Sequence, residues 1–205
     1  IGFSDMICQT GEEEEKQEYM KIVSSNNELL LQLIDDILDL SKIEAGTMEF
    51  TLAPTDINDL MKGICRQMQE KNTSPDVAIT FTEKAEECIL NTDRVRLSQV
   101  IINFTNNAMK FTPKGSIQMG YRIDEAKDEI YFYVKDTGIG IPADKINEVF
   151  ERFVKLNTFA KGTGLGLAIC RVIVERLGGT IGADSKEGEG SCFWFRLPIT
   201  QKSNN

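Results

Sequence analysis

Three glycines stand at every second position in KGTGLGLAIC (residues 161–170), and an apolar run compatible with a helix follows them directly. Backbone N–H groups in the first turn of a helix have no partner inside the helix, so a helix start without bulky side chains can bind an anion such as phosphate. A flexible turn that binds nothing has the same pattern. The spacing matches neither the G-x-x-x-x-G-K-[ST] phosphate loop nor the G-x-G-x-x-G dinucleotide motif.

A second group of polar side chains lies in NFTNNAMKFT (residues 103–112). Asn103 and Asn107 are four residues apart, which places both carboxamides on one face of a helix. A carboxamide oxygen suits Mg²⁺, the ammonium group of Lys110 suits a phosphate, and the ring of Phe111 can stack on a base. A helix with a polar outer face is the alternative interpretation.

An acid and two glycines follow a strand-like run in DTGIGI (residues 136–141). Asp136 can accept a hydrogen bond from an exocyclic amine such as that of adenine. Gly138 and Gly140 would let the backbone approach a flat ring. A plain Asp-Gly turn is equally compatible with these residues.

Two aromatic residues three positions apart, Phe150 and Phe153, are predicted to be core residues of FERFVK (residues 150–155). Lys155 precedes a polar loop that can act as a lid over a ligand. GEGS (residues 188–191) is a further glycine-containing turn.

The residues around these motifs predict helices and strands in irregular order. The predicted helices are residues 10–45, 57–70, 93–110 and 166–177, and the predicted strands are residues 47–53, 78–82, 88–91, 116–123, 129–135, 179–185 and 191–197. Asp56 or Thr55 would cap the second helix, and Gly46 would end the first. Because strands and helices do not alternate regularly, we expect an α+β fold, a two-layer α/β sandwich with helices on one face of a mixed sheet.

The first predicted helix is unusually long. Apolar residues recur every three to four positions from Tyr19 to Ile43. A helix of this length spans about 50 Å at about 1.5 Å per residue, and its apolar stripe is wide enough for a helical bundle. We therefore expect a partner chain to cover the stripe. A long core helix of a single domain is the alternative.

The composition excludes several classes of function. The 205 residues carry a formal net charge of −9, which argues against nucleic-acid binding, because that affinity comes mainly from neutralising phosphates. The sequence contains no histidine, which excludes a histidine base or metal ligand within these residues. Five scattered cysteines without a C-x-x-C pair indicate reduced thiols of a cytoplasmic protein. No transmembrane segment or signal peptide is expected.

Taken in order, these motifs resemble the ATP-binding catalytic domain of sensor histidine kinases, which has the GHKL or Bergerat fold. The resemblance covers residues 93–198 densely: NFTNNAMKFT is similar to the N box, DTGIGI to the G1 box, FERF to the F box, GTGLGLAI to the G2 box and GEGSCFWF to the last glycine motif. LLLQLIDDILDLSKIEAG resembles the second helix of the family's dimerisation domain. The resemblance implies a partial dimerisation hairpin (residues 1–46), an ATP-binding domain (residues 47–198) and a disordered tail (residues 199–205).

The resemblance also implies a site for ATP and Mg²⁺. Asn107 would hold Mg²⁺ beside Asn103, and Lys110 and Lys155 would meet the phosphates. The residues implied to wrap the triphosphate are Gly162, Thr163, Gly164, Leu165 and Gly166.

At the other end of the implied site, Phe111 would lie against adenine and Asp136 would bind its amino group. Gly138, Gly140 and Ile141 would provide backbone around the base. Related ATPases of this fold have a glutamate in place of Asn103, and a carboxamide, unlike a carboxylate, cannot activate water. The resemblance therefore implies that ATP is saved for a protein acceptor.

In this family the phosphate goes to a histidine on the first dimerisation helix, which by resemblance would lie about three helical turns before Ile1. The sequence would then be a fragment that binds ATP without phosphorylating itself and holds no catalytic residue of its own. Its parent would be bacterial, a homodimer through the helical domain, and the cytoplasmic part of a membrane-anchored or hybrid sensor. Its partner would be a response-regulator receiver domain.

Three other functions are compatible with parts of the sequence. An anti-sigma-factor-type serine kinase shares the fold, but DLSKIEAG at the end of the long helix argues against it. A regulatory module can bind nucleotide without transferring phosphate. A structural coiled coil with an inert domain is disfavoured by the intact N, G1 and G2 boxes.

Overall fold

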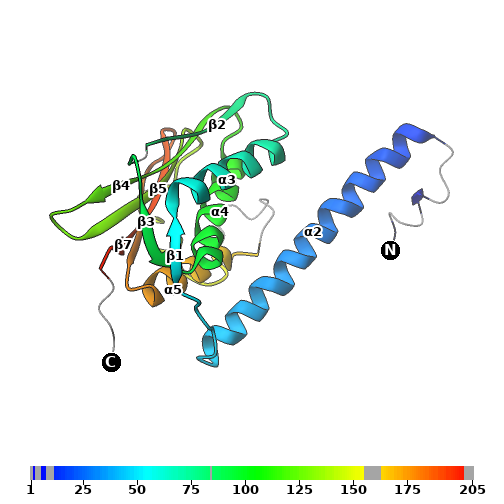
Figure 1. Cartoon of the computed structure of the whole chain (residues 1–205). Helices are drawn as coiled ribbons and strands as arrows, with labels where there is room; N and C mark the ends of the chain where they lie inside the picture. Colours follow the sequence, from blue (N-terminus) through cyan, green and yellow to red (C-terminus); the bar gives the residue numbers. More distant parts are fainter. Residues whose placement is uncertain (1, 3–5, 8–11, 84, 155–162, 201–205) are drawn as a thin grey trace. The chain divides into compact units, whose positions relative to one another are not determined.

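The computed structural model describes residues 2, 6–7, 12–83, 85–154 and 163–200. The chain divides into two compact units. The first contains the residues up to Met48, and the second contains two sheets and three helices (Figure 1). The elements after the first unit run in the order β1, α3, β2, β3, α4, β4, β5, α5, β6 and β7.

One long helix, α2 (Glu13–Glu44), makes up most of the first unit. Three glutamates occupy its first turn, where negative charge interacts favourably with the helix dipole. The predicted end at Gly46 is confirmed: Gly46 has φ +67°, its N–H bonds to Ile43 O at 3.1 Å, and the N–H of Thr47 bonds to Lys42 O at 2.9 Å. These two bonds form a Schellman motif, which needs a left-handed residue at this position. The predicted start at Thr10 lies outside the described residues.

The apolar stripe of α2 is exposed to a large degree. Leu31 is the most exposed of its large side chains at 62%, and Ile37 is 46% exposed. The full set of exposed large apolar residues on α2 is Met20, Leu30, Leu31, Leu33, Ile34, Ile37 and Leu38. A set of this size on one helix is typical of a surface that packs against another helix.

The main sheet of the second unit has five strands in the order β2–β4–β5–β7–β6. Its strands are β2 (Val77–Glu83), β4 (Gly115–Asp124), β5 (Glu129–Asp136), β6 (Thr180–Lys186) and β7 (Gly190–Pro198). Only β2 and β4 are parallel, and the other neighbours are antiparallel. The predicted mixed sheet is therefore confirmed, and β4–β5 and β6–β7 are antiparallel hairpins.

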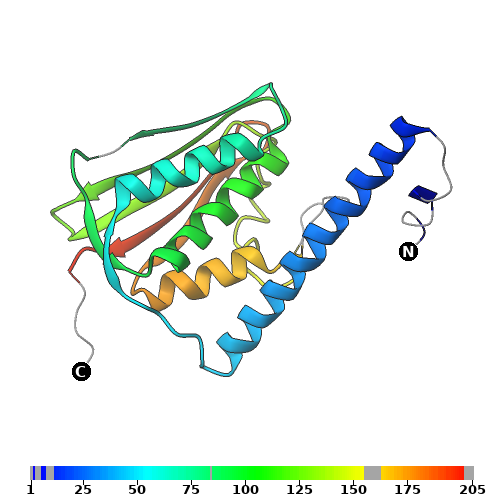
Figure 2. The same ribbon diagram turned by 45° about the vertical axis from the view of Figure 1, so that its right-hand side comes forward.

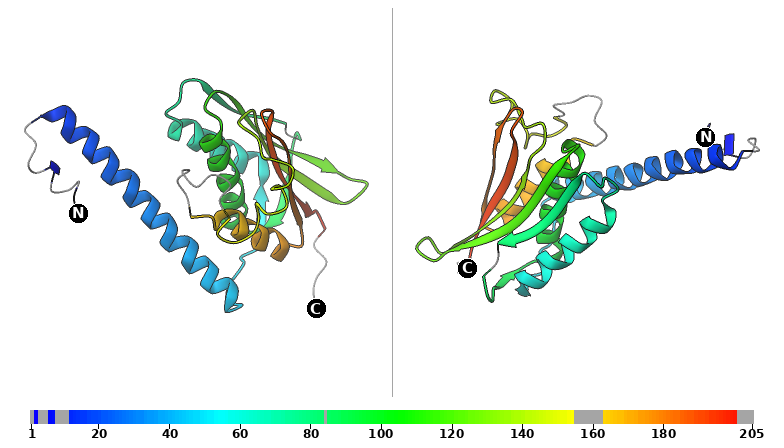
Figure 3. Two further views of the ribbon diagram at one scale, coloured as in Figure 1. Left: turned by 180° about the vertical axis from the view of Figure 1, so that it is seen from behind. Right: turned by 90° about the horizontal axis from the view of Figure 1, so that it is seen from above.

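Three helices cover one face of this sheet (Figures 2 and 3). They are α3 (Ile57–Lys71), α4 (Arg94–Phe111) and α5 (Gly166–Arg176), and α4 contacts both of the others. The predicted cap at Asp56 is confirmed, since its carboxylate accepts a hydrogen bond from the N–H of Asp59 at 3.1 Å. Asp93 caps α4 in the same way through the N–H groups of Val95 and Arg96. The predicted two-layer α+β architecture is thus confirmed.

Aromatic side chains fill the space between α4 and the sheet. Phe104 of α4 is fully buried, and its ring centroid lies 5.5 Å from that of Phe193 and 6.0 Å from that of Phe195 on β7. Phe195 also stacks on Phe132 of β5, with ring centroids 4.7 Å apart. This cluster attaches the central helix to the two central strands and so positions both ends of α4.

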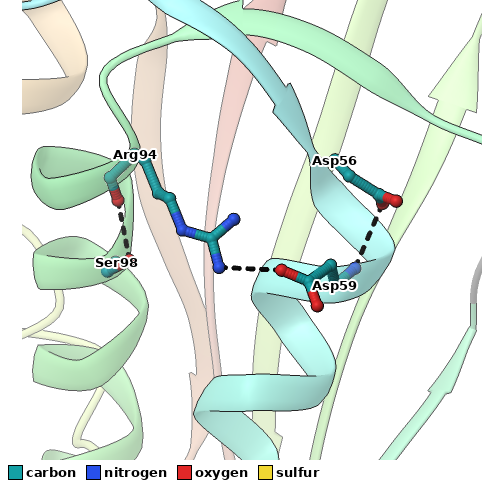
Figure 4. A network of polar contacts seen from close by, with 4 residues as sticks. All are labelled: Asp56, Asp59, Arg94 and Ser98. Atoms are coloured by element: carbon teal, nitrogen blue, oxygen red, sulfur yellow. Dashed lines mark hydrogen bonds and ion pairs between the residues drawn. The ribbon is translucent and has the colours of Figure 1, made fainter.

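An exposed polar network joins the starts of α3 and α4 (Figure 4). The guanidinium group of Arg94 donates to the carboxylate of Asp59 at 2.9 Å, and the hydroxyl of Ser98 donates to Arg94 O at 2.7 Å. Because both side chains of the ion pair are more than half exposed, the pair adds little stability. It aligns the two helices at the end where both are capped.

One predicted strand is wrong. Residues 47–52 form no regular element, and the strand β1 is Ala53–Asp56, paired antiparallel with β3 (Ile89–Thr92). The N–H of Thr51 donates to the Asp93 carboxylate at 2.8 Å instead of to a neighbouring strand. Pro54 does not interrupt the strand β1. Because the sheet has only two strands, β1 is an edge strand, where a residue without a backbone N–H is tolerated.

Replacing Phe195 by alanine should lower the free energy of unfolding of the second unit by about 3–5 kcal/mol, because the ring is 1% exposed and its loss leaves a cavity. Denaturant unfolding followed by circular dichroism measures the change. Val95→Ala on α4 is the control, since Val95 is 72% exposed and should change stability by less than about 0.5 kcal/mol. Equal effects of the two substitutions would contradict the assigned core.

Candidate functional site

The last turns of α4 carry the predicted polar face. Asn103 and Asn107 are both half-buried, and among the described residues neither carboxamide has a hydrogen-bond partner. A Cβ atom added to Gly166 would lie 3.2 Å from Asn103 Oδ1. The start of α5 therefore lies directly beside the asparagine face of α4. Asn106, by contrast, points elsewhere and accepts a hydrogen bond from Lys71 Nζ at 3.5 Å.

The end of α4 is joined to the loop that follows β5. The N–H of Ile139 donates to Phe111 O at 3.1 Å. Lys110 is exposed, and its Nζ lies 4.8 Å from the centroid of the half-buried Phe111 ring. This cation–π contact holds the ammonium group over the aromatic ring. The structure thus brings Lys110, Phe111 and the DTGIGI loop together, as the sequence predicted.

Asp136 ends β5 and is 4% exposed. Its Oδ1 accepts hydrogen bonds from the N–H of Gly138 at 2.8 Å and from the N–H of Ser191 at 3.3 Å. Burial raises the pKa of the Asp136 carboxyl above its ordinary value, and these two backbone donors oppose the rise by favouring the carboxylate. Both backbone donors engage the same oxygen, Oδ1.

The hydroxyl of Thr112 is a buried polar group beside this carboxyl. Thr112 is 2% exposed. Its hydroxyl lies beside the Asp136 carboxyl, where it favours the carboxylate form and so lowers the pKa of Asp136. Its Oγ1 nevertheless has no hydrogen-bond partner of good geometry among the described residues. A buried hydroxyl without a partner is costly, which indicates that a ligand or water completes the site.

Two positions of the loop after Asp136 accept only glycine. A Cβ atom on Gly138 would lie 2.3 Å from Phe111 O. Gly140 has φ +68°, and a Cβ atom there would lie 2.1 Å from Lys186 O. The buried Ile141 continues the loop, and its N–H donates to the hydroxyl of Ser185 at 2.8 Å. The loop is therefore packed between the end of α4 and the β6–β7 turn, with no side chain at either glycine.

The glycine segment before α5 is fixed at its base. The N–H of Phe153 donates to Gly164 O at 2.9 Å, and both residues have positive φ, +62° and +75°. The prediction that Phe150 is a core residue is confirmed by its 7% exposure. The same prediction for Phe153 is wrong, because its ring is 68% exposed and the left-handed backbone turns it away from the core. Lys155 and Gly162 lie outside the described residues.

The start of α5 is suited to an anion. Leu165, 2% exposed, occupies the N-cap position, and no side chain caps the helix. N–H groups in the first turn of a helix have no partner inside the helix, and phosphate oxygens fit such a position. Thr163 belongs to the first compact unit, and its role as a phosphate-binding residue stays a prediction.

The donor set fits a magnesium nucleotide. Asn107 offers an oxygen, which Mg²⁺ prefers, and Mg²⁺ commonly takes one or two protein oxygens together with substrate phosphates. Among the described residues no cluster of three or more Asp, Glu, Cys or His side chains forms a metal site. The Thr112 hydroxyl and the backbone at Gly138 and Gly140 are a second set of groups, beside Asp136, that suits a base.

Comparison with known proteins places this geometry in a family. Residues 92–201 match the family described as histidine kinase-, DNA gyrase B- and HSP90-like ATPase, and residues 1–46 match the His kinase A (phospho-acceptor) domain. The first match covers more than half of the chain. The chain belongs to the histidine kinase-like ATPase family. The order of its two matched domains is that of a sensor histidine kinase.

Similar proteins of this histidine kinase group come from bacteria and eukaryotes. The chain is 36% identical over 192 residues to the circadian input-output histidine kinase CikA of Synechococcus elongatus, covering 90% of this chain and 25% of that protein. It is 34% identical to two-component system protein A of Emericella nidulans, covering 97% of this chain and 30% of that protein. The chain thus spans about a quarter of the length of such relatives. A bacterial origin stays a prediction.

A solved structure of a histidine kinase has the same fold. Full-length ShkA in complex with AMPPNP superposes with a TM-score of 0.79 and 29% identity, covering 95% of this chain and 41% of that chain. The catalytic domain of the histidine kinase ThkA superposes with a TM-score of 0.65 and 32% identity, covering 75% of this chain.

Within the described part of the chain, no helix has the length and apolar character needed to cross a bilayer.

Sequence reasoning missed three hydroxyl residues of the site. Thr112 and Ser191 lie beside Asp136, and Ser185 holds the loop at Ile141. The signal for two of them was present, because Thr112 ends NFTNNAMKFT and Ser191 ends GEGS. Their roles depend on which backbone atoms meet at Asp136, and that follows only from the pairing of β5 with β7.

The raised pKa of Asp136 predicts a pH-dependent stability difference. The folded protein holds this proton up to a higher pH than the unfolded chain, so the stabilisation from Asp136 is complete below the ordinary value of 3.8 and is lost as pH rises through the folded pKa. Asp136→Asn, which stays neutral, should therefore gain stability relative to the parent as pH rises above 3.8. Denaturant unfolding at each pH measures this. Exposed Asp144→Asn is the control, and an equal pH trend in both variants would contradict the assignment.

Proposed function

We propose that this chain binds Mg-ATP and is the ATP-binding part of a histidine kinase that transfers the γ-phosphoryl group to a histidine, for relay to a response-regulator aspartate. One observation carries the proposal. A buried acceptor, Asp136, lies at one end of a glycine-lined loop, and the uncapped start of α5 lies against the asparagine face of α4. An adenine amine and a triphosphate need these two features in one site.

The base would be recognised at the buried end. Asp136 Oδ2 accepts a hydrogen bond from the exocyclic amine of adenine, while Oδ1 stays bonded to Gly138 and Ser191. The Thr112 hydroxyl gains the partner that it lacks among the described residues. Because guanine carries a carbonyl in place of that amine, two acceptors would face each other and guanine would be rejected.

The phosphates and the metal would lie toward the helix ends. Asn107 binds Mg²⁺, and Lys110 and Lys155 neutralise phosphate charge. The N–H groups at Gly164, Leu165 and Gly166 bind phosphate oxygens. When bound, Mg²⁺ would supply positive charge to the phosphate oxygens, and the residues would contribute positioning, which is most of what phosphoryl transfer needs.

Asn103 is the residue that would keep ATP from reacting with water. It lies beside the first residue of α5, where the phosphates are proposed to bind. A carboxamide has no basic form near neutral pH, so it cannot remove a proton from an attacking water. The nucleotide would therefore persist until a protein acceptor enters the site.

The acceptor histidine would be supplied by another helix. The 205 residues contain no histidine, although residues 1–46 match the phospho-acceptor domain. We infer that the exposed stripe of α2 packs in a helical bundle, as a homodimer, and that this bundle carries the acceptor and the docking surface for a receiver domain. These residues alone would bind ATP without phosphorylating themselves. A nucleotide-binding regulatory module without transfer activity is the second candidate.

Asn107→Ala should abolish Mg-dependent nucleotide binding, because it removes the protein ligand of the metal. Calorimetric titration with ADP and AMPPNP, with and without Mg²⁺, measures the effect. Asn106→Ala is the matched control, since Asn106 is the neighbouring residue on the same helix and bonds to Lys71 instead.

In the same titrations Asp136→Ala should reduce the preference for ADP over GDP. Parent-like binding by both site variants would refute the site.

Phosphoryl transfer separates the two candidate functions. This chain, extended upstream by a histidine-bearing helix and incubated with radiolabelled Mg-ATP, should gain label on that histidine. The unextended chain should bind ATP and gain none. Label that persists in the extended Asn107→Ala variant would contradict the proposed metal ligand. Tight ATP binding without label in the extended chain would favour the regulatory module.

A further inference from the structure

Ser185 of β6 bonds to the end of the DTGIGI loop (residues 136–141). Its hydroxyl oxygen accepts a hydrogen bond from the N–H of Ile141 at 2.8 Å. The turn of the same hairpin supports the neighbouring loop residue, since the N–H of Gly188 donates to Ile139 O at 2.8 Å. Only the first of these two bonds uses a side chain, so it is the one that a substitution can remove.

The start of the loop meets the other strand of the hairpin. The N–H of Ser191 on β7 donates to Asp136 Oδ1 at 3.3 Å. A Cβ atom on Gly190, which has φ +97°, would lie 2.1 Å from Asp136 O. Backbone therefore lies directly against backbone at this point. A shift of β7 at Gly190 and Ser191 would move the donor that holds the Asp136 carboxylate.

The Ser185 hydroxyl also joins the two strands of the hairpin. It donates to Gly190 O at 2.8 Å, and its Oγ lies 3.0 Å from Ser191 Oγ. A hydroxyl has one proton to donate and two lone pairs to accept with. With its proton on Gly190 O, Ser185 accepts from both the Ile141 N–H and the Ser191 hydroxyl, which uses its full hydrogen-bonding capacity. One oxygen atom thus bonds to the end of the loop and to both residues that meet Asp136.

The serine pair continues the inner row of β7 toward the site. Ser185 lies opposite Ser191 across the hairpin, and Ser191 is two residues before the core residue Phe193, so both serines lie on the face that the helices cover. Two apolar side chains would extend the core at these positions. They would leave the Ile141 N–H without this acceptor, which is costly for a backbone donor that water does not reach. The hydroxyls therefore serve the loop rather than the core.

We propose that Ser185 is a positioning residue for base recognition, which holds the DTGIGI loop through Ile141 and the Asp136 carboxylate through Ser191 in the geometry that prefers adenine to guanine. This inference rests on the proposed ATP site and adds to it a residue that sets its selectivity. Ser185 acts through its neighbours and does not touch the nucleotide. Hydrogen bonds weaken steeply with distance and misalignment, so a displaced loop would lose part of the preference for an amine.

Ser185→Ala should lower the ratio of ADP affinity to GDP affinity at least about fivefold, because the carboxylate is no longer held in position. Calorimetric titration of each nucleotide in the presence of Mg²⁺ gives the two affinities. The ratio separates positioning from stability, since unfolded chains reduce both apparent affinities by the same factor. Thr180→Ala is the matched control: it removes a hydroxyl from the exposed first residue of the same strand and should leave the ratio within about twofold of the parent.

The conservative variant tests the hydroxyl itself. Ser185→Thr keeps the hydroxyl on a residue suited to a strand and should restore the ratio to within about twofold of the parent. A ratio as low as that of Ser185→Ala would overturn the proposal, because the hydroxyl would then not be the group responsible.

Two further results would contradict the role of Ser185. One is a parent-like ratio in Ser185→Ala, and the other is an equal loss in Thr180→Ala. If the parent prefers ADP and the Ser185→Ala ratio is unchanged, only this inference fails. If the parent binds neither nucleotide, the proposed ATP site is refuted and this inference with it.

Discussion

The contact that orders the candidate site is the buried carboxylate of Asp136. A single oxygen, Oδ1, accepts from the backbone of Gly138 in its own loop and of Ser191 at the start of β7. A buried carboxyl without such donors would be costly, so the loop and the β6–β7 hairpin are held where they supply them. The second oxygen then has a defined position, which is what recognition of an amine requires.

The position of α4 follows from a different kind of force. Phe104 is enclosed by Phe193 and Phe195, and this apolar contact sets the height of the helix over the sheet. Since Asn103 and Asn107 flank that ring in the sequence, the asparagine face is positioned by the same packing. The carboxamides of Asn103 and Asn107 have no hydrogen-bond partner among the described residues. The packing of Phe104, on the opposite side of the same helix, fixes their position.

Along each strand of the main sheet, successive side chains point to opposite faces. In β5 the residues Ile130, Phe132 and Val134 enter the core, and Tyr131, Tyr133 and Lys135 lie on the other face of the sheet. On this face the rings of Tyr133 and Trp194 lie against Gly120 and Gly182 of neighbouring strands, and arginine side chains stack on them. The core side packs against α3, α4 and α5.

Much of the fold could be predicted because the signals were local. The caps at Asp56 and Asp93, the end of α2 at Gly46 and both hairpins depend on residues within a few positions of one another, and each was recognisable in the sequence. The predicted strand at residues 47–53 failed because its backbone donor at Thr51 is used by Asp93, 42 residues away. Phe153 failed because a bond to Gly164 gives it a left-handed backbone.

By itself, the sequence determined the family and the residue types of the site, because the motifs and their spacing are carried by the chain directly. Only the tertiary structure decided that Thr112 and Ser191 join Asp136 and that Asn103 meets the start of α5. These are relations between backbone positions far apart in the chain. They depend on strand register and on helix packing, which no local pattern encodes.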